Sequence, residues 1–178
     1  MIPVVSKGAM AVKNIEVKLV SELIKNSRRS DRELAKVLGI SQPTVSRMIK
    51  RFEKEEIIQG YCAIPNLAKL GMEIVAIVLL NLRHQSDPNT RMQKADEFVE
   101  KHPNLIFASS GIGSMSDRVA ISVHKSYSDY TKFVQDLKEH SELYTIVDTF
   151  LISYKSDSIP KPLSFKTLGD YITKEKPE

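Results

Sequence analysis

Apolar residues fall three and four positions apart in the first part of the chain and predict two short helices before residue 40. The first is expected over residues 12–26, with an apolar stripe of Val12, Ile15, Leu19, Leu23 and Ile24. The second should begin after Ser30, because Glu33 three residues on completes a capping-box pattern. It should end at Gly39, since glycine readily adopts the left-handed conformation that terminates a helix.

A third helix is predicted over residues 42–54. Ser41 can cap it, and proline is tolerated in its first turn because the amide there has no intrahelical acceptor. Its apolar stripe is Val45, Met48, Ile49 and Phe52, and its opposite face carries donors and cations: Gln42, Thr44, Ser46, Arg47, Lys50 and Arg51. Two helices that cross at a short turn need a small residue at their contact, a glycine in the turn and a β-branched anchor in the second helix. The sequence provides these as Ala35, Gly39 and Val45. Together these features predict a helix-turn-helix with residues 42–54 as its recognition helix.

The recognition helix is followed by residues 55–64, a segment whose pattern is typical of two short strands around a turn. Such a wing makes the predicted module, residues 1–64, a winged helix-turn-helix. Arg28 and Arg29, between the first two helices, could hold DNA phosphates or remain solvated loop charges. The alternative for the whole module is a small helical bundle with a solvated basic face.

The second half alternates between strand and helix patterns in the order β-α-β-β-α-β. Strands are expected over residues 73–82, 105–109, 118–124 and 144–154, and helices over residues 88–101 and 128–139. This order predicts an α+β, ferredoxin-like domain over residues 73–154, in which one antiparallel sheet carries both helices on one face. A linker over residues 65–72 and a tail over residues 155–178 complete the expected organisation. In the tail, the helical spacing of Leu168, Tyr171 and Ile172 predicts a short docking helix; the alternative is a partly disordered tail.

The second face of the predicted sheet is also expected to be apolar. The first strand is apolar on both sides, and the last strand should place Ile146, Phe150 and Ile152 on one side. An uncovered apolar face needs a partner surface, so two such sheets are expected to pack face to face in a homodimer. The alternative is that the C-terminal tail covers this face within one chain.

Charge divides the chain in the same way. The 178 residues carry a net charge of +4, but residues 1–54 carry +7 and the remainder −3, which indicates that the first part meets a polyanion. The longest apolar run, residues 74–80, is too short to cross a bilayer, and the N-terminus lacks signal-peptide features, so a cytoplasmic location is expected. The single cysteine, Cys62, excludes an intrachain disulfide.

A winged helix-turn-helix followed by a β-α-β-β-α-β domain resembles the Lrp/AsnC family, the prokaryotic feast/famine transcription regulators, whose second domain is of the RAM, ligand-binding type. The resemblance covers about residues 12–154. It implies a homodimer paired through the C-terminal sheets, tetramers or octamers of such dimers, and small effectors, usually amino acids, bound between dimers. The residues that carry the resemblance are 30–36, 39–41, Val45, Arg47, Arg51, 57–61, Leu70, Gly71 and the strand from Ile74.

In that family a glycine, two residues and an aspartate border the effector pocket, commonly with an aromatic residue before the aspartate. Asp117 matches this pattern, whereas Ser114 stands at the usual glycine and Ser116 replaces the aromatic residue. A glycine-rich turn with hydroxyls and amides could bind a carboxylate, or it could be an ordinary hairpin loop. The effector site implied by the resemblance consists of Gly111, Gly113, Ser114, Met115, Ser116 and Asp117.

These observations predict a nucleoid-associated, sequence-specific regulator of transcription that binds pseudopalindromic double-stranded DNA and needs no cofactor beyond an effector. One alternative is a tetrapyrrole-processing enzyme, because siroheme decarboxylases resemble this two-domain layout. The histidines available to such an enzyme are scattered without catalytic or metal-binding spacing: His84, His102, His124 and His140. Another alternative is a nucleoid-type architectural protein with little sequence preference.

Overall fold

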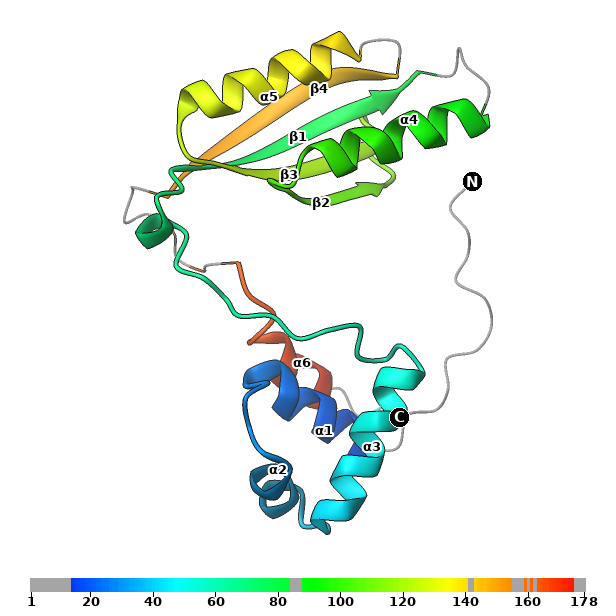
Figure 1. Ribbon diagram of the computed structural model, residues 1–178, viewed down its shortest axis with the longest axis vertical. Helices are drawn as coiled ribbons and strands as arrows, with labels where there is room; N and C mark the ends of the chain where they lie inside the picture. Colours follow the sequence, from blue (N-terminus) through cyan, green and yellow to red (C-terminus); the bar gives the residue numbers. More distant parts are fainter. Residues whose placement is uncertain are drawn as a thin grey trace. The chain divides into compact units, whose positions relative to one another are not determined.

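The computed structural model describes residues 14–83, 88–140, 143–154, 159, 161 and 163–174. These residues form two compact units. The helical unit joins the N-terminal helices to the C-terminal helix, and the sheet unit holds the four strands with two further helices (Figure 1). Within the described ranges, no helix is long and apolar enough to cross a membrane.

The helical unit consists of α1 (Asn14–Lys25), α2 (Asp31–Leu38), α3 (Gln42–Lys54) and α6 (Leu168–Lys174). The apolar stripes predicted from spacing meet in its centre, which confirms the three N-terminal helices. Val12, the first residue of the predicted stripe of α1, lies outside the described residues. The buried core of the unit is Leu19, Leu23, Leu34, Ala35, Val45 and Phe52.

Local capping chemistry fixes the ends of α2. The Ser30 hydroxyl accepts a hydrogen bond from the Glu33 amide at 3.3 Å, and the Glu33 carboxylate accepts from the Ser30 amide at 2.7 Å. Hydrogen bonds from the Ser30 amide and hydroxyl lower the pKa of Glu33. At the other end Gly39 has a φ of 68°, in the left-handed region that favours glycine. The predicted capping box and glycine terminator are therefore both confirmed.

Replacing Ser30 with alanine is expected to lower the unfolding free energy of the helical unit by about 1 kcal/mol, because the Glu33 amide loses its acceptor at the first turn of α2. Urea denaturation followed by circular dichroism measures the change. Ser27→Ala is the matched control, since Ser27 is exposed in the preceding turn and caps no helix. Equal unfolding free energies for the two variants would contradict a stabilising role for the cap.

The segment that follows α3 does not form the predicted wing strands. Residues 55–66 contain no strand in the structure, so this part of the prediction is wrong. The chain instead turns at once: Glu56 adopts a positive φ of 56°, and the Ile58 amide donates to the Phe52 carbonyl at 3.1 Å. The sequence pattern satisfied strand propensity, but a two-stranded hairpin alone is only marginally stable and this one has no third strand to pair with.

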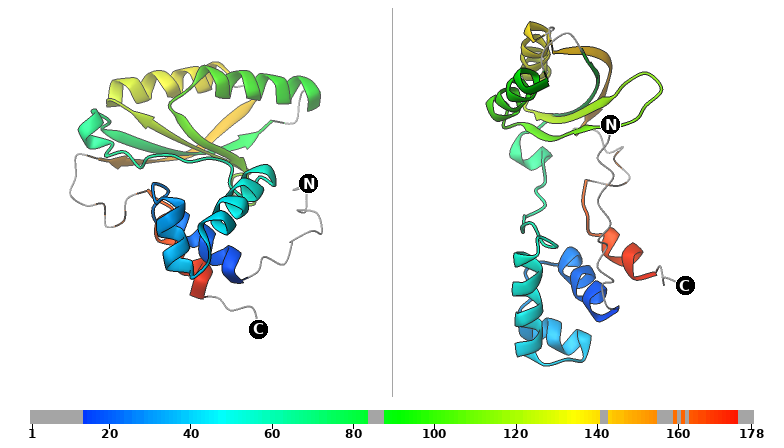
Figure 2. Two further views of the ribbon diagram at one scale, coloured as in Figure 1. Left: turned by 60° about the horizontal axis from the view of Figure 1, so that its bottom comes forward. Right: turned by 90° about the vertical axis from the view of Figure 1, so that its right-hand side faces the viewer.

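The sheet unit follows the predicted order of elements and confirms the α+β, ferredoxin-like fold. Its strands pair antiparallel in the spatial order β2-β3-β1-β4. Both helices cover the same face of the sheet (Figures 1 and 2). The elements are the 3₁₀ turn η1 (Ala68–Leu70), β1 (Ile74–Leu82), α4 (Pro88–Lys101), β2 (Leu105–Ser110), β3 (Arg118–His124), α5 (Tyr127–Glu139) and β4 (Tyr144–Ser153).

The core of the sheet unit lies between the sheet and these two helices. Alternate residues of β1 point into it, so that Ala76, Val78 and Leu80 are buried. The helices contribute aromatic side chains, among them Phe98 of α4 and Phe133 of α5, whose ring centroids lie 6.0 Å apart. The residues between these β1 positions must therefore face the opposite side of the sheet.

That opposite side, the open face, carries an apolar row across all four strands. Ile77 of β1 pairs with Ile121 of β3 and with Phe150 of β4, and Ile121 pairs in turn with Phe107 of β2. Paired residues lie on the same face of a sheet. Phe150 is 66% exposed and Phe107 is 49% exposed. The open face therefore has the apolar character that the sequence predicts, and we call these four residues the apolar row.

One residue of the predicted open face lies on the helix side instead. The pairing of β1 with β4 shifts after Leu79, so that Leu80 pairs with Ile146 and one residue of β4 is left over. Ile146 consequently packs against the core between sheet and helices, while Phe150 pairs on the open face. Simple alternation predicts Ile146 and Phe150 on the same side of the sheet. The bulge between them adds one residue to β4, so the residues of β4 that precede the bulge lie on the opposite side from the one predicted.

Candidate nucleic-acid interface

The outward face of α3 carries a row of three cations. Val45 and Phe52 of α3 are fully buried, and Arg47, Lys50 and Lys54 are exposed on the opposite side. Residues three, four and seven positions apart share one face of a helix, so these side chains form a continuous basic stripe. Arg47 and Lys50 belong to the exposed face predicted from the sequence; Lys54 was not among the predicted residues, although it lies four positions after Lys50.

Two of the predicted DNA-contacting hydroxyls already have partners inside the helical unit. The Ser46 hydroxyl donates to the carboxylate of Asp31 at the start of α2. The Thr44 and Ser41 hydroxyls lie 2.8 Å apart, and Ser41 also accepts from the Thr44 amide at 3.4 Å. These contacts hold α3 against α2 and fix its first turn. Gln42, by contrast, is exposed at the start of α3.

Arg51 lies on the flank of α3 that faces α1. It pairs with Glu16 of α1, its Nε lies 3.7 Å from the Glu55 carboxylate, and its guanidinium stands 5.1 Å from the Phe52 ring centroid. The hydrogen bond to Glu16 raises the pKa of Arg51. Arg51 is thus held by neighbours on three sides, unlike the three residues of the basic stripe.

The two arginines between α1 and α2 differ in the same way. Arg29 pairs with Glu22 of α1. Burial opposes ionisation of Glu22, but hydrogen bonds from Lys25 and Arg29 lower its pKa overall. Arg28 is exposed. Among the described residues, Arg28 and the basic stripe make no ion pair, so these four cations remain available to a polyanion.

Tyr61, in the segment after α3, contacts Glu53 of that helix. Its hydroxyl donates to the Glu53 carboxylate at 2.9 Å. Burial and this hydrogen bond raise the pKa of Tyr61 to about 12, so the phenol stays protonated at physiological pH. The bond ties the segment after α3 to the last turns of that helix and engages a carboxylate that is adjacent in sequence to Lys54 of the basic stripe.

The predicted effector residues form the loop between β2 and β3, and this loop is tied to the end of β1. Asp117 Oδ1 accepts from the Leu82 amide at 3.0 Å, and the Asp117 amide donates to Asn81 Oδ1 at 3.1 Å. The Asn81 side-chain amide donates to the Met115 carbonyl at 2.9 Å. Asp117 therefore shapes the loop, and Asn81 is its partner, which sequence reasoning missed because the two residues are 36 positions apart.

The loop itself is tight and presents its longer side chains to solvent. The Gly111 amide donates to the Asp117 carbonyl at 2.9 Å. A Cβ on Gly113 would lie 2.7 Å from the Ser116 carbonyl oxygen, so only glycine fits there. Met115 is 72% exposed, Ser114 beside it is exposed, and Ser116 is half-buried. The six predicted residues are thus brought together on one hairpin.

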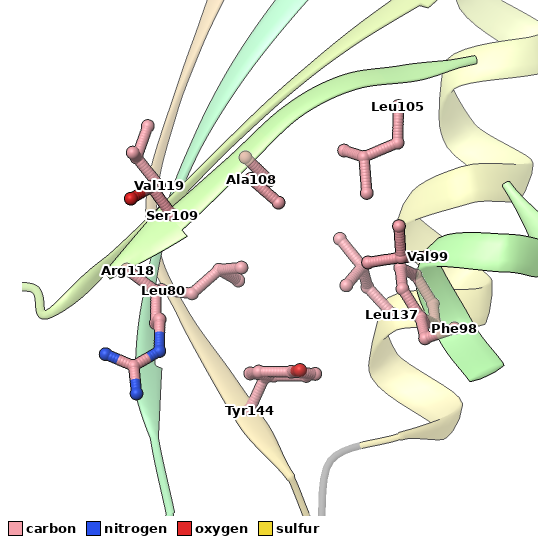
Figure 3. A pocket seen from close by; sticks show the side chains of 11 residues that line it. Leu80, Phe98, Val99, Leu105, Ala108, Ser109, Arg118, Val119, Leu137 and Tyr144 are labelled. Carbon is pink, nitrogen blue, oxygen red and sulfur yellow. The ribbon is translucent and has the colours of Figure 1, made fainter. Parts of the chain in front are cut away.

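A small pocket lies on the other side of this hairpin, between the sheet and the helices (Figure 3). Its volume is about 60 Å³. The Tyr144 ring and the Phe98 and Leu137 side chains line it, while the guanidinium of Arg118 points away from these apolar groups. None of the six effector residues borders it. The pocket is therefore separate from the predicted effector residues.

The histidines of the sheet unit have structural partners. His124 is fully buried and its Nε2 lies 2.8 Å from the Ser122 hydroxyl. Burial lowers the pKa of His124, and Asp129 opposes this in part. His102 lies between the Phe98 carbonyl at 2.8 Å and the Asp136 carboxylate at 3.1 Å. The described residues hold no group of three metal-ligating side chains; His84 lies outside the described residues.

Comparison with known proteins agrees with the helix-turn-helix. A family model described as winged helix-turn-helix DNA-binding matches residues 13–59. The HTH-type transcriptional regulator Ptr1 of Methanocaldococcus jannaschii is 32% identical over 124 residues, which cover 68% of this chain and 78% of that protein. The leucine-responsive regulatory protein of Rhizobium meliloti is 38% identical over 77 residues, 43% of this chain and about half, 49%, of that protein.

The fold of the whole chain also has solved counterparts. The transcriptional regulator NMB0573 of Neisseria meningitidis, solved as a complex with L-Met, superposes with a TM-score of 0.68. The match covers 86% of this chain and 97% of that chain at 16% identity. The likeness at this identity concerns the fold, and it includes both the helix-turn-helix and the sheet unit.

Proposed function

The chain belongs to the Lrp/AsnC family of transcription regulators, and from this premise we propose that it binds pseudopalindromic DNA as a homodimer through the basic stripe of α3. It is a DNA-binding transcription regulator and not an enzyme. Nothing found for the chain favours the tetrapyrrole-processing alternative. As a regulator of transcription, it would act at the nucleoid.

The observation that carries the proposal is the basic stripe of Arg47, Lys50 and Lys54 on the exposed side of a recognition helix, which makes no ion pair with any residue that the structure describes. A helix of this kind fits the major groove, where arginine reads guanine and glutamine reads adenine by paired hydrogen bonds. We therefore assign base contacts to Arg47 and Gln42 and phosphate contacts to Lys50, Lys54 and Arg28. The remaining candidates support this surface through their protein contacts: Thr44, Ser46, Arg51 and Arg29.

The open face of the sheet supports the homodimer. The apolar row puts exposed aromatic side chains at both edges of a four-stranded sheet. Packing this face against its copy would remove them from water and create a two-fold axis. Two recognition helices related by that axis read half-sites about one helical turn, ~10 bp, or a multiple apart. Further assembly of such dimers into tetramers or octamers belongs to the same proposal.

We assign effector binding to the loop between β2 and β3. The proposal is supported by the amino-acid complex of the Neisseria regulator and by the clustering of the six predicted residues on one hairpin. Exposed Ser114 and half-buried Ser116 offer hydroxyls, and turn amides can bind a carboxylate. An amino acid is the expected effector class, and no other cofactor is proposed.

Replacing Arg47 with alanine is expected to weaken specific DNA binding by roughly 1–3 kcal/mol, because a paired hydrogen bond to guanine is lost. The operator is first selected from genomic fragments, and affinity is then measured by fluorescence anisotropy at one fixed salt concentration. Lys69→Ala is the control: it removes an exposed cation from η1, which belongs to the sheet unit and not to the helix-turn-helix, and should leave affinity unchanged. If Arg47→Ala binds as tightly as the wild type, the stripe does not read the operator.

The same measurement separates a specific regulator from an architectural protein. A specific regulator prefers its operator to random DNA by about three orders of magnitude or more at physiological salt. An architectural protein would bind both with similar affinity and a steep dependence on salt. The second result would overturn sequence-specific recognition while leaving DNA binding intact.

A further inference from the structure

The C-terminal helix α6 docks on α1 through a very close backbone approach. The hydroxyl of Ser21 donates to the Gly169 carbonyl at 2.6 Å, and Ser21 is only 1% exposed. A Cβ on Gly169 would lie 2.8 Å from the Ser21 carbonyl oxygen and 3.1 Å from Lys25 Cγ. The two backbones therefore approach so closely at this point that only glycine fits without a shift.

A second contact fixes the direction in which α6 lies. Lys25 Nζ is 2.9 Å from the Asp170 carboxylate and 3.1 Å from that of Glu22. Burying the Ser21 hydroxyl would cost free energy without an acceptor, and α6 supplies that acceptor. A helix of seven residues is unstable alone in water, so α6 depends on this docking.

The two chain segments that reach the helical unit leave the sheet unit from adjacent positions. Ile74, the first residue of β1, pairs with Ser153, the last residue of β4. The Tyr154 amide also donates to the Glu73 carbonyl at 2.8 Å. Residues 55–73 and residues 154–167 are therefore two connections with a common origin, and both end on the helical unit.

We propose that α6 is a second attachment of the DNA-binding helices, which restricts their rotation relative to the sheet unit and so fixes the spacing of half-sites that a dimer can bind. This inference rests on the proposed function. One flexible connection lets the recognition helix sample many orientations. A second connection of fourteen residues, at most about 50 Å long when extended, removes many of them. When one recognition helix is bound, the effective concentration of the second one at its half-site is then higher for one spacing of the half-sites and lower for the others.

Two independent changes remove the attachment. Gly169→Leu places a side chain against the Ser21 backbone while raising the intrinsic helix propensity of α6, so undocking cannot be attributed to a weaker helix. Thr173→Leu is the matched control, since it adds the same side chain at an exposed position of α6. The second change inserts a protease recognition sequence after Tyr154. Cleaving the purified protein there severs the connection, and the uncut sample is its own control.

The readout is affinity for paired half-sites at the selected spacing and with about 5 bp, half a helical turn, inserted between them. Insertion should lower the affinity of the wild type, Thr173→Leu and the uncut protein by at least about thirtyfold. It should lower the affinity of Gly169→Leu and the cut protein by less than about fivefold. Binding to a single half-site should be the same for all five. Amide hydrogen exchange of α6 verifies its release in Gly169→Leu.

The outcomes are distinguishable. Cut and uncut proteins with the same loss on insertion would overturn the attachment, as would a wild type that binds all spacings equally. A wild type that binds neither paired nor single sites would instead refute the proposed function. If Gly169→Leu unfolds the helical unit, exchange across α1 to α3 reports it, and the cut protein decides the question.

Discussion

Phe150→Asp is expected to convert the proposed dimer to a monomer and to weaken binding to paired half-sites by about two to four orders of magnitude. Phe150 is the most exposed member of the apolar row and pairs with Ile77 at the centre of the sheet. A carboxylate there would have to be buried without a partner if two open faces packed together. Each monomer would keep its recognition helix and lose the gain from simultaneous binding.

Sedimentation or light scattering measures the first effect, and anisotropy with paired and single half-sites measures the second. Tyr127→Asp is the matched control. Tyr127 is also an aromatic residue, 61% exposed, but it lies in the first turn of α5, where an acid is favourable. A dimeric Phe150→Asp with unchanged operator affinity would show that the open face is not the interface.

The second large effect is on stability. Phe52→Ala should reduce the unfolding free energy of the helical unit by about 3–5 kcal/mol, a large part of the 5–15 kcal/mol typical of a whole domain. Phe52 is fully buried against Leu34 and Val45, and its ring also lies beneath the Arg51 guanidinium. Its loss would leave a cavity at the centre of the helix-turn-helix.

Peptide-resolved hydrogen exchange is the suitable measurement, because the helical and sheet units can open independently. The amides of α1 to α3 should lose protection, while those of β1 and β3 should keep it. Val37→Ala serves as control: Val37 is 57% exposed on α2, so its truncation should change stability by less than about 0.5 kcal/mol. Unchanged protection in Phe52→Ala would mean that the core of the unit lies elsewhere.

Helices with local signals were predictable from the sequence. Ser30, Glu33 and Gly39 act within one or two turns of each other, and the bounds of α2 followed from them. The failures depended on partners far along the chain. Residues 55–64 had strand propensity, but no third strand is available to pair with them. Ile146 lies on the other face of the sheet because of a bulge that the sequence did not indicate.

In the candidate site, too, features set by nearby residues were predictable and contacts with distant residues were not. The exposed side of α3 followed from helical spacing, but the engagement of Ser46 and Arg51 did not, since Asp31 and Glu16 lie 15 and 35 positions away. The tail helix was expected to dock through its apolar residues. It docks through Gly169, while Leu168 and Tyr171 are 40% and 58% exposed. Close backbone packing leaves no apolar pattern for sequence analysis to detect.

The distance in sequence between α3 and α6 also sets an order of events during synthesis. The ribosome releases α1 to α3 first, and about 120 further residues must follow before Lys174 emerges. At about 5–20 residues per second this delay is roughly 6–24 s. During that interval the nascent helix-turn-helix has its core and its basic stripe, but the Ser21 hydroxyl does not yet have the Gly169 carbonyl as its acceptor. The helix-turn-helix is therefore made before the sheet unit, and the helix that completes its own unit is made after it.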